Sequence, residues 1–161
     1  MATAWKGSET RLEIRRTFAA PRAKVFAAWT EREKLERWMC RDVATHEPKY
    51  TELDVRPGGR YVIEIPMVKE GFIYRGKGVF REVKPPERLV FTWAWEKVPM
   101  GKGKPEELQE KESVVTVELF ERGKSTEMIF THEGFASAKE REEHQRGWDG
   151  CFEKLGEFLG A

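Results

Sequence analysis

Hydrophobic and polar residues alternate along most of the chain with a period of two, which is typical of strands that bury one face. Residues 60–67 show this pattern most clearly, since Tyr61, Ile63 and Ile65 share one face of the predicted strand. The same period recurs on both sides of this segment, more weakly at 50–55. The expected strands are residues 11–18, 50–55, 60–67, 72–83, 89–96, 113–120 and 125–133.

Two short helices are expected after the first strand. The two-residue period stops at Pro21, and proline suits the first turn of a helix because that turn needs no hydrogen-bond donor from it. Thr30 and Glu33 form a capping-box pattern, which predicts the start of a second helix. We therefore expect helices over about 21–29 and 31–38.

A long amphipathic helix is expected at the C-terminal end of the sequence. Ser137 and Glu140 form a second capping box. Apolar residues then recur at intervals of three and four as far as about Gly160, which is the stripe of a helix that packs on a core. The residues of this stripe are Trp148, Cys151, Phe152, Leu155, Phe158 and Leu159.

The order of these elements predicts an α+β fold. Most connections between the expected strands are short turns, which requires antiparallel pairing; the polar segment 99–111 is expected to be a mobile loop. The arrangement is that of a helix-grip fold, a curved antiparallel sheet of about seven strands wrapped round a long C-terminal helix. We expect residues 1–161 to form one domain, with its core over about 11–160.

Composition and charge exclude several classes of partner. The chain has 29 basic and 28 acidic residues, so its charge gives no reason to expect nucleic acid. No apolar run approaches the roughly 20 residues of a membrane span, and no signal peptide is visible, so a cytoplasmic location without membrane insertion is expected. Cys40 and Cys151 are far apart in the sequence and are expected to be reduced thiols.

Aromatic residues make up 12% of the chain and fall mostly on one face of the predicted strands. One helix cannot fill the hollow of a strongly curved sheet, so we expect an apolar cavity between the sheet and the C-terminal helix. Small-molecule sites are concave and mostly apolar. The expected cavity-lining residues are Trp38, Tyr61, Ile63, Phe72, Tyr74, Phe80, Glu82, Phe91, Trp93, Trp95, Phe130, His132, Trp148 and Phe152.

Two polar residues in this set are unusual for an inward face. His132 is expected to be a hydrogen-bonded core residue. An unpaired buried carboxylate is costly, so Glu82 is expected either to have a neighbouring arginine, Arg16 or Arg60, or to lie at the mouth of the cavity. The alternative is that Glu82 and His132 orient a ligand or act as an acid/base pair. His46, His132 and His144 show no metal-ligand spacing with one another or with the two cysteines, so neither a metal nor a cofactor is expected.

Several segments resemble those of a known family. They are the run from Phe18 to Thr30 followed by Leu35 and Trp38, the segments 54–59 and 85–93, the segment His132–Phe135, and the pair Gly147-Trp148. Together they resemble the activator-of-heat-shock-ATPase homologue-like family of the START-like, or polyketide-cyclase-like, superfamily (SRPBCC, Bet v-like). The resemblance implies the helix-grip fold. The superfamily includes lipid and hormone carriers, cyclases and aromatases, and co-chaperone domains.

Three functions are compatible with this sequence. The first is a protein that binds a hydrophobic or amphipathic small molecule, such as a lipid, an isoprenoid or an aromatic compound, in the apolar cavity. The second is a cofactor-free cyclase or hydrolase, which requires Glu82, His132 or Tyr74 to converge in that cavity, although no catalytic motif is present. The third is a co-chaperone-like adaptor or homodimer, which requires an exposed apolar patch; Trp5 and the 99–111 segment are candidates for it.

Overall fold

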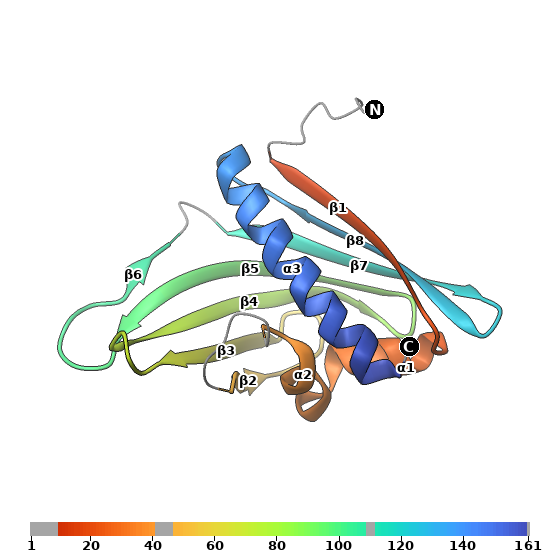
Figure 1. Cartoon of the computed structure of the whole chain (residues 1–161), viewed down its shortest axis with the longest axis horizontal. Helices are drawn as coiled ribbons and strands as arrows, with labels where there is room; N and C mark the ends of the chain where they lie inside the picture. The colour runs from red at the N-terminus through yellow and green to blue at the C-terminus, as the bar shows by residue number, and fades with distance from the viewer. Residues whose placement is uncertain (1–9, 41–46, 109–111, 161) are drawn as a thin grey trace.

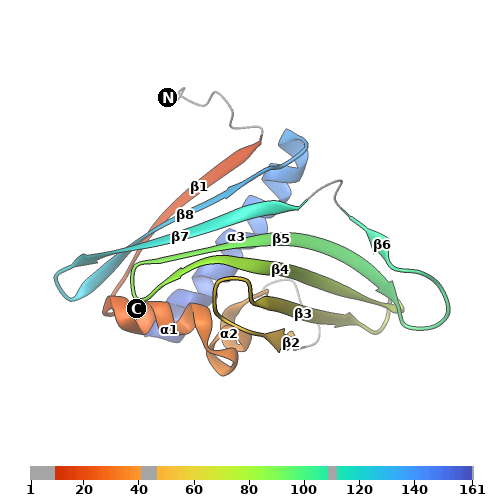
Figure 2. The same cartoon turned by 180° about the vertical axis from the view of Figure 1, so that it is seen from behind.

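A computed structural model of the chain describes residues 10–40, 47–108 and 112–160. A long, curved antiparallel sheet forms one side of the molecule, and the C-terminal helix lies diagonally across its concave face (Figure 1). Seen from behind, the sheet covers this helix (Figure 2). The strands are β1 (Arg11–Phe18), β2 (Lys49–Leu53), β3 (Arg60–Met67), β4 (Phe72–Lys84), β5 (Arg88–Pro99), β6 (Glu106–Glu107), β7 (Ser113–Arg122) and β8 (Ser125–Glu133). The helices are α1 (Arg22–Thr30), α2 (Arg32–Trp38) and α3 (Ala138–Leu159).

The strand order is β1-β8-β7-β5-β4-β3-β2, with β6 paired to β5 beside this path. Every pairing is antiparallel. The two short helices follow β1 and lie beside the C-terminal half of α3 (Figure 1). The predicted α+β helix-grip fold is confirmed, including the two short helices and the long helix that the sheet surrounds.

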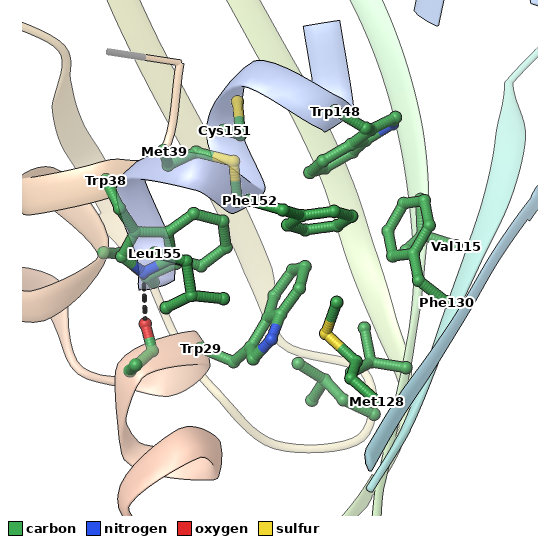
Figure 3. Close-up of a cluster of buried hydrophobic side chains, with 14 of the residues drawn as sticks. Trp29, Trp38, Met39, Val115, Met128, Phe130, Trp148, Cys151, Phe152 and Leu155 are labelled. Carbon is green, nitrogen blue, oxygen red and sulfur yellow. Dashed lines mark hydrogen bonds between the residues drawn. The ribbon is translucent and has the colours of Figure 1, made fainter. Parts of the chain in front are cut away.

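The C-terminal half of α3 packs into an aromatic core with the two short helices. Trp29 of α1 and Trp38 of α2 meet edge to face with ring centroids 4.8 Å apart, and the Trp38 indole N–H donates to the Ala28 carbonyl across 2.9 Å (Figure 3). Phe152 of α3 packs on Phe130 of β8, with centroids 4.9 Å apart. This end of the fold is therefore filled by side chains.

The two expected capping boxes have different outcomes. The Ser137 side chain accepts a hydrogen bond from the Glu140 backbone N–H across 3.1 Å, so Ser137 caps α3 as predicted. The prediction for Thr30 is wrong: this residue ends α1, and its hydroxyl donates to the Phe26 carbonyl four residues earlier. Glu31 takes the N-cap position of α2 without a side-chain hydrogen bond.

The segment after β5 is more ordered than expected. The sequence predicted a loop over 99–111, but Glu106 and Glu107 form β6 and pair with Lys97 and Glu96. The same strand β5 pairs with β7 along Arg88–Trp93. The partner of β5 therefore changes from β7 to β6 between Trp93 and Glu96, and Trp95 lies at this change of partner.

Candidate functional site

A cavity of about 560 Å³ lies between the N-terminal two-thirds of α3 and the concave face of β3, β4 and β5. Its floor is buried, whereas Leu108, Lys139 and Glu143 at its rim are exposed. The residues that line it are Cys40, Ile65, Tyr74, Trp93, Trp95, Leu108, Ser137, Lys139, Glu140, Glu143, His144, Gly147, Trp148 and Cys151.

One wall of the cavity is a continuous row of aromatic rings. The Trp95 ring lies 6.1 Å from Tyr74 and 5.4 Å from Trp93 between centroids, and Trp93 lies 5.0 Å from Trp148. Tyr74 and Trp95 are half-buried, whereas Trp93 and Trp148 are buried. The row therefore runs from the accessible part of the cavity to its floor and joins the sheet to α3.

The absence of a side chain at Gly76 makes room for this wall. A Cβ atom at Gly76 would lie 2.9 Å from Cγ2 of Ile63 and 3.2 Å from Cζ3 of Trp95, which is closer than unstrained packing permits. The glycine thus lets the Trp95 ring approach the backbone of β4 closely.

The opposite wall comes from α3 and is polar toward the rim. His144, Gly147 and Cys151 follow one another on the face of α3 that also carries Trp148. The Nδ1 atom of His144 is hydrogen-bonded to the Glu140 carbonyl across 2.9 Å, so it donates, while Nε2 is buried and has no hydrogen-bond partner among the described residues. This nitrogen exposes almost no surface, so a ligand in the cavity does not contact it in this conformation.

His132 lies behind the aromatic wall and is fully buried. The Trp148 indole N–H donates to its Nδ1 across 3.0 Å, and its Nε2 lies 2.6 Å from Oγ of Ser113. An indole nitrogen can only donate, so Nδ1 of His132 carries no proton and Nε2–H donates to Ser113. The Ser113 hydroxyl in turn donates to the Trp93 carbonyl across 3.2 Å.

The protonation of His132 follows from this environment. Burial lowers the pKa of His132 well below its ordinary value of 6.5, and the nearby His144 lowers it further. Both ring nitrogens are engaged in the neutral form, so the imidazole connects β8, β7 and α3 as a structural element. This arrangement agrees with the expectation of a hydrogen-bonded core histidine.

The expectation that Glu82 faces inward is wrong. A bulge between Phe80 and Glu82 shifts the register of β4 against β5 by one residue, so Glu82 pairs with Val90 rather than with a residue of the core face. Glu82 instead accepts hydrogen bonds from Arg88 at 2.6 Å and lies 3.2 Å from Lys84. These neighbours, and not Arg16 or Arg60, lower the pKa of Glu82, with the Arg88 hydrogen bond the larger cause.

The structure divides the remaining expected cavity residues into three groups. Tyr74, Trp93, Trp95 and Trp148 line the cavity. Phe72 is half-buried beside Tyr74, with the Lys97 ammonium 4.3 Å from its ring centroid. The others lie in the packed core, away from the cavity wall: Trp38, Tyr61, Ile63, Phe80, Phe91, Phe130, His132 and Phe152.

Most of the cavity residues that the sequence analysis missed belong to α3. His144 and Gly147 continue the apolar stripe of that helix toward its N-terminus at intervals of three and four residues. This spacing could have identified them, but their polarity and small size hid it. Cys40 and Leu108 follow α2 and β6 and carry no periodic signal.

The polar residues of the described chain do not form a metal site. In residues 10–40, 47–108 and 112–160, no group of three or more His, Cys, Asp or Glu side chains could hold a metal ion. His46 lies outside the described residues. None of the helices in the described part of the chain is long and apolar enough to span a bilayer.

A curved antiparallel sheet with a cavity beneath its long C-terminal helix defines the helix-grip class of proteins. Within it, the chain belongs to the Activator of Hsp90 ATPase homolog 1-like protein family, which it matches over residues 19–160. The predicted family is thereby confirmed. No curated protein matches the chain.

Solved structures with the same fold come from several bacteria. Protein CV1439 from Chromobacterium violaceum superposes with a TM-score of 0.76 at 20% identity, covering 94% of this chain and 98% of its own. Mll3558 from Rhizobium loti has a TM-score of 0.70 at 28% identity, covering 93% and 96%. CalU16 from Micromonospora echinospora has a TM-score of 0.63 at 27% identity, covering 92% of this chain and 75% of its own.

Proposed function

We propose that the protein binds a hydrophobic or amphipathic small molecule in the cavity beneath α3. The observation that carries this proposal is the row of four aromatic rings along a cavity of about 560 Å³. Ligand pockets in proteins usually have volumes of about 300–1,000 Å³ and apolar walls with a few polar groups. The cavity meets both conditions.

The walls indicate how a ligand would lie. A flat aromatic ring or an isoprenoid or lipid chain can pack against Trp95 and Tyr74, which are the accessible members of the aromatic row. Charged ends of a ligand can remain near Lys139 and Glu143 at the exposed rim. An amphipathic ligand therefore uses both walls.

The structure gives less support to a catalytic function. The enzyme hypothesis required Glu82, His132 or Tyr74 to converge, but Glu82 lies on the outer face of β4 and both ring nitrogens of His132 are engaged in the core. Tyr74 alone lines the cavity. No acid/base pair is therefore formed by the candidate residues.

The adaptor hypothesis required an exposed apolar patch. Among the described residues, the exposed large hydrophobic side chains are those of Val68, Val79, Met100 and Leu108, which come from four different segments, and Leu108 belongs to the cavity rim. Trp5 lies outside the described residues. A binding protein in the cytoplasm is the better proposal, and two cysteines that form no disulfide suit that reducing compartment.

Native mass spectrometry after incubation with a lipid and metabolite extract tests the proposal. The expected result is a reproducible adduct of small-molecule mass on the wild-type chain. The matched variants are Gly147→Phe, whose side chain would enter the cavity, and Gly147→Ala, which leaves it open; a Cβ at this position meets no atom within 4 Å. Binding by the alanine variant but not by the phenylalanine variant supports the cavity. An adduct on both, or on neither, contradicts it.

A further inference from the structure

The two cysteines, which are 111 positions apart in the sequence, meet at the floor of the cavity. The backbone N–H of Cys40, just after α2, donates to Sγ of Cys151 in the middle of α3 across 3.2 Å. Both residues line the cavity, and neither is in a disulfide. Their separation along the chain gives no sign of this contact in the sequence.

The hydrogen bond places the Cys151 sulfur close to the backbone of Cys40. Because the N–Cα bond adds only about 1.5 Å, Cα of Cys40 lies within about 4.7 Å of the Cys151 sulfur. The Cys151 sulfur is therefore close to the point from which the Cys40 side chain starts. A disulfide also requires that the two Cα atoms lie about 4.4–6.8 Å apart, and rotation of the two side chains about their Cα–Cβ bonds is the movement that would join the sulfurs.

The environment of Tyr50 agrees with the proximity of the two cysteines. Burial raises the pKa of Tyr50 well above its ordinary value of 10, and Cys40 and then Cys151 raise it further. Each thiol thus lies close enough to the same phenol to disfavour its negative charge. Cys40, just after α2, and Cys151 of α3 thus both lie in the neighbourhood of this tyrosine.

The backbone of Cys40 is itself unusual. Its φ angle is +59°, and it is the one residue other than glycine with a positive φ among those described. A residue with a Cβ adopts this region rarely, and such conformations concentrate at functional sites, where the surrounding structure holds them. Here the conformation directs the Cys40 N–H toward the Cys151 sulfur.

The cavity supplies a route for a reagent. Cys40 and Cys151 are only 6% and 4% exposed, yet they form part of the wall of a space of about 560 Å³ with an exposed rim. A molecule the size of hydrogen peroxide can reach both sulfurs through it. Accessible thiols with a second thiol nearby are the ones that oxidise reversibly.

We propose that Cys40 and Cys151 are a redox-active dithiol that a peroxide oxidises to an intramolecular disulfide. One thiolate attacks the peroxide, so that an S–O bond forms, the O–O bond breaks and the hydroxide released takes up a proton to become water. The second thiolate attacks the resulting sulfenic sulfur; the S–S bond forms, the S–O bond breaks, and a second water leaves. The two sulfurs lose two electrons and the peroxide gains them.

Intact-mass and peptide analysis of the ligand-free chain after hydrogen peroxide treatment tests this site. The expected result is a mass decrease of about 2 Da, reversed by dithiothreitol. Trypsin should then release one cross-linked species that joins the peptides 38–41 and 147–154, which are bounded by Arg or Lys in the sequence. The Cys40→Ser and Cys151→Ser variants are the matched controls and should gain oxygen instead.

Three outcomes overturn the proposal: thiols that remain unmodified in excess peroxide, mass gains of about 16 Da per oxygen on the wild-type chain without the 2 Da decrease, and a disulfide between two chains. Because the decisive measurement is made on the wild-type protein, it does not depend on the folding of either variant. It also needs no bound ligand, so its failure is distinct from failure of the proposed binding function.

Discussion

The indole N–H of Trp148 donates to Nδ1 of His132 across 3.0 Å, and this bond joins the cavity wall on α3 to the sheet. Because the indole can only donate, the bond fixes the neutral tautomer of His132 with its proton on Nε2. That proton is directed at Ser113 on β7. A chain of three side chains thus holds the helix over the hollow of the sheet and sets the position of one aromatic ring of the cavity.

The first prediction concerns the pH dependence of stability. The folded protein keeps the pKa of His132 well below 6.5, whereas the unfolded chain has an ordinary value, so the unfolded state binds more protons as the pH falls. The stability that depends on neutral His132 is fully present above about pH 6.5 and is lost below it, by up to about 1.4 kcal/mol per pH unit. Urea unfolding at several pH values between 7.5 and 5 measures this slope.

A His132→Gln variant provides the control for that slope. It keeps a polar side chain at this position but cannot titrate, so its free energy of unfolding should fall less steeply below pH 6.5 than that of the wild type. Equal slopes in the two proteins would show that His132 does not carry the effect.

The second prediction concerns Ser113→Ala. The substitution removes the acceptor of the His132 Nε2–H bond, whose two groups are both buried. An unpaired buried donor costs about 1–3 kcal/mol, so the free energy of unfolding of the variant should be lower by about this amount. Urea unfolding measures the loss as a lower midpoint concentration. The double variant Ser113→Ala/His132→Gln measures the coupling, because strictly additive losses would contradict the proposed bond.

The comparison of Glu82 with His132 shows how far the sequence predicts this site. Alternation placed both on inward faces; it succeeds for His132 because β8 pairs regularly with β1 and β7. It fails for Glu82 because the bulge in β4 uses one extra residue and exchanges the two faces beyond it. Neither the residue type nor the period marks that bulge.

The cavity itself is predictable only in part. The aromatic wall of β4 and β5 follows from the alternation of large residues, and four of the expected residues line the cavity. Apart from Trp148, the α3 wall does not, because its other residues are polar or small and their position depends on how the helix lies across the sheet. Cys40 and Cys151 illustrate the limit: their contact comes from tertiary packing between α2 and α3.

The third prediction separates the stability of α3 from occupancy of the cavity. Gly147→Ala should raise the free energy of unfolding by about 0.5–1 kcal/mol, because alanine favours a helix interior over glycine and its Cβ meets no atom within 4 Å. Gly147→Phe should remain folded and fill the space. Fluorescence of the probe 1-anilinonaphthalene-8-sulfonate should rise with the wild-type and alanine proteins and not with the phenylalanine variant.

The fourth prediction compares the two faces of the sheet. Trp95→Ala removes a ring from the cavity wall and should weaken binding of the same probe roughly tenfold, equivalent to about 1.4 kcal/mol. Glu82→Gln alters an ion pair with Arg88 on the outer face and should leave the affinity unchanged. Probe titrations on both variants test whether the probe binds at the cavity wall, and urea unfolding verifies that each variant is folded. An equal loss in both would place the binding site elsewhere.

The fifth prediction concerns the glycine beneath the aromatic wall. Gly76→Ala adds a Cβ that would lie 2.9 Å from Ile63 and 3.2 Å from Trp95, so the Trp95 ring must move into the cavity or the strands must separate. Either response should lower the free energy of unfolding by about 1–3 kcal/mol and weaken probe binding together with it. Gly101→Ala is the matched control, since its Cβ meets no atom within 4 Å. If Gly76→Ala behaves like Gly101→Ala in both urea unfolding and probe titration, the wall does not depend on this close approach.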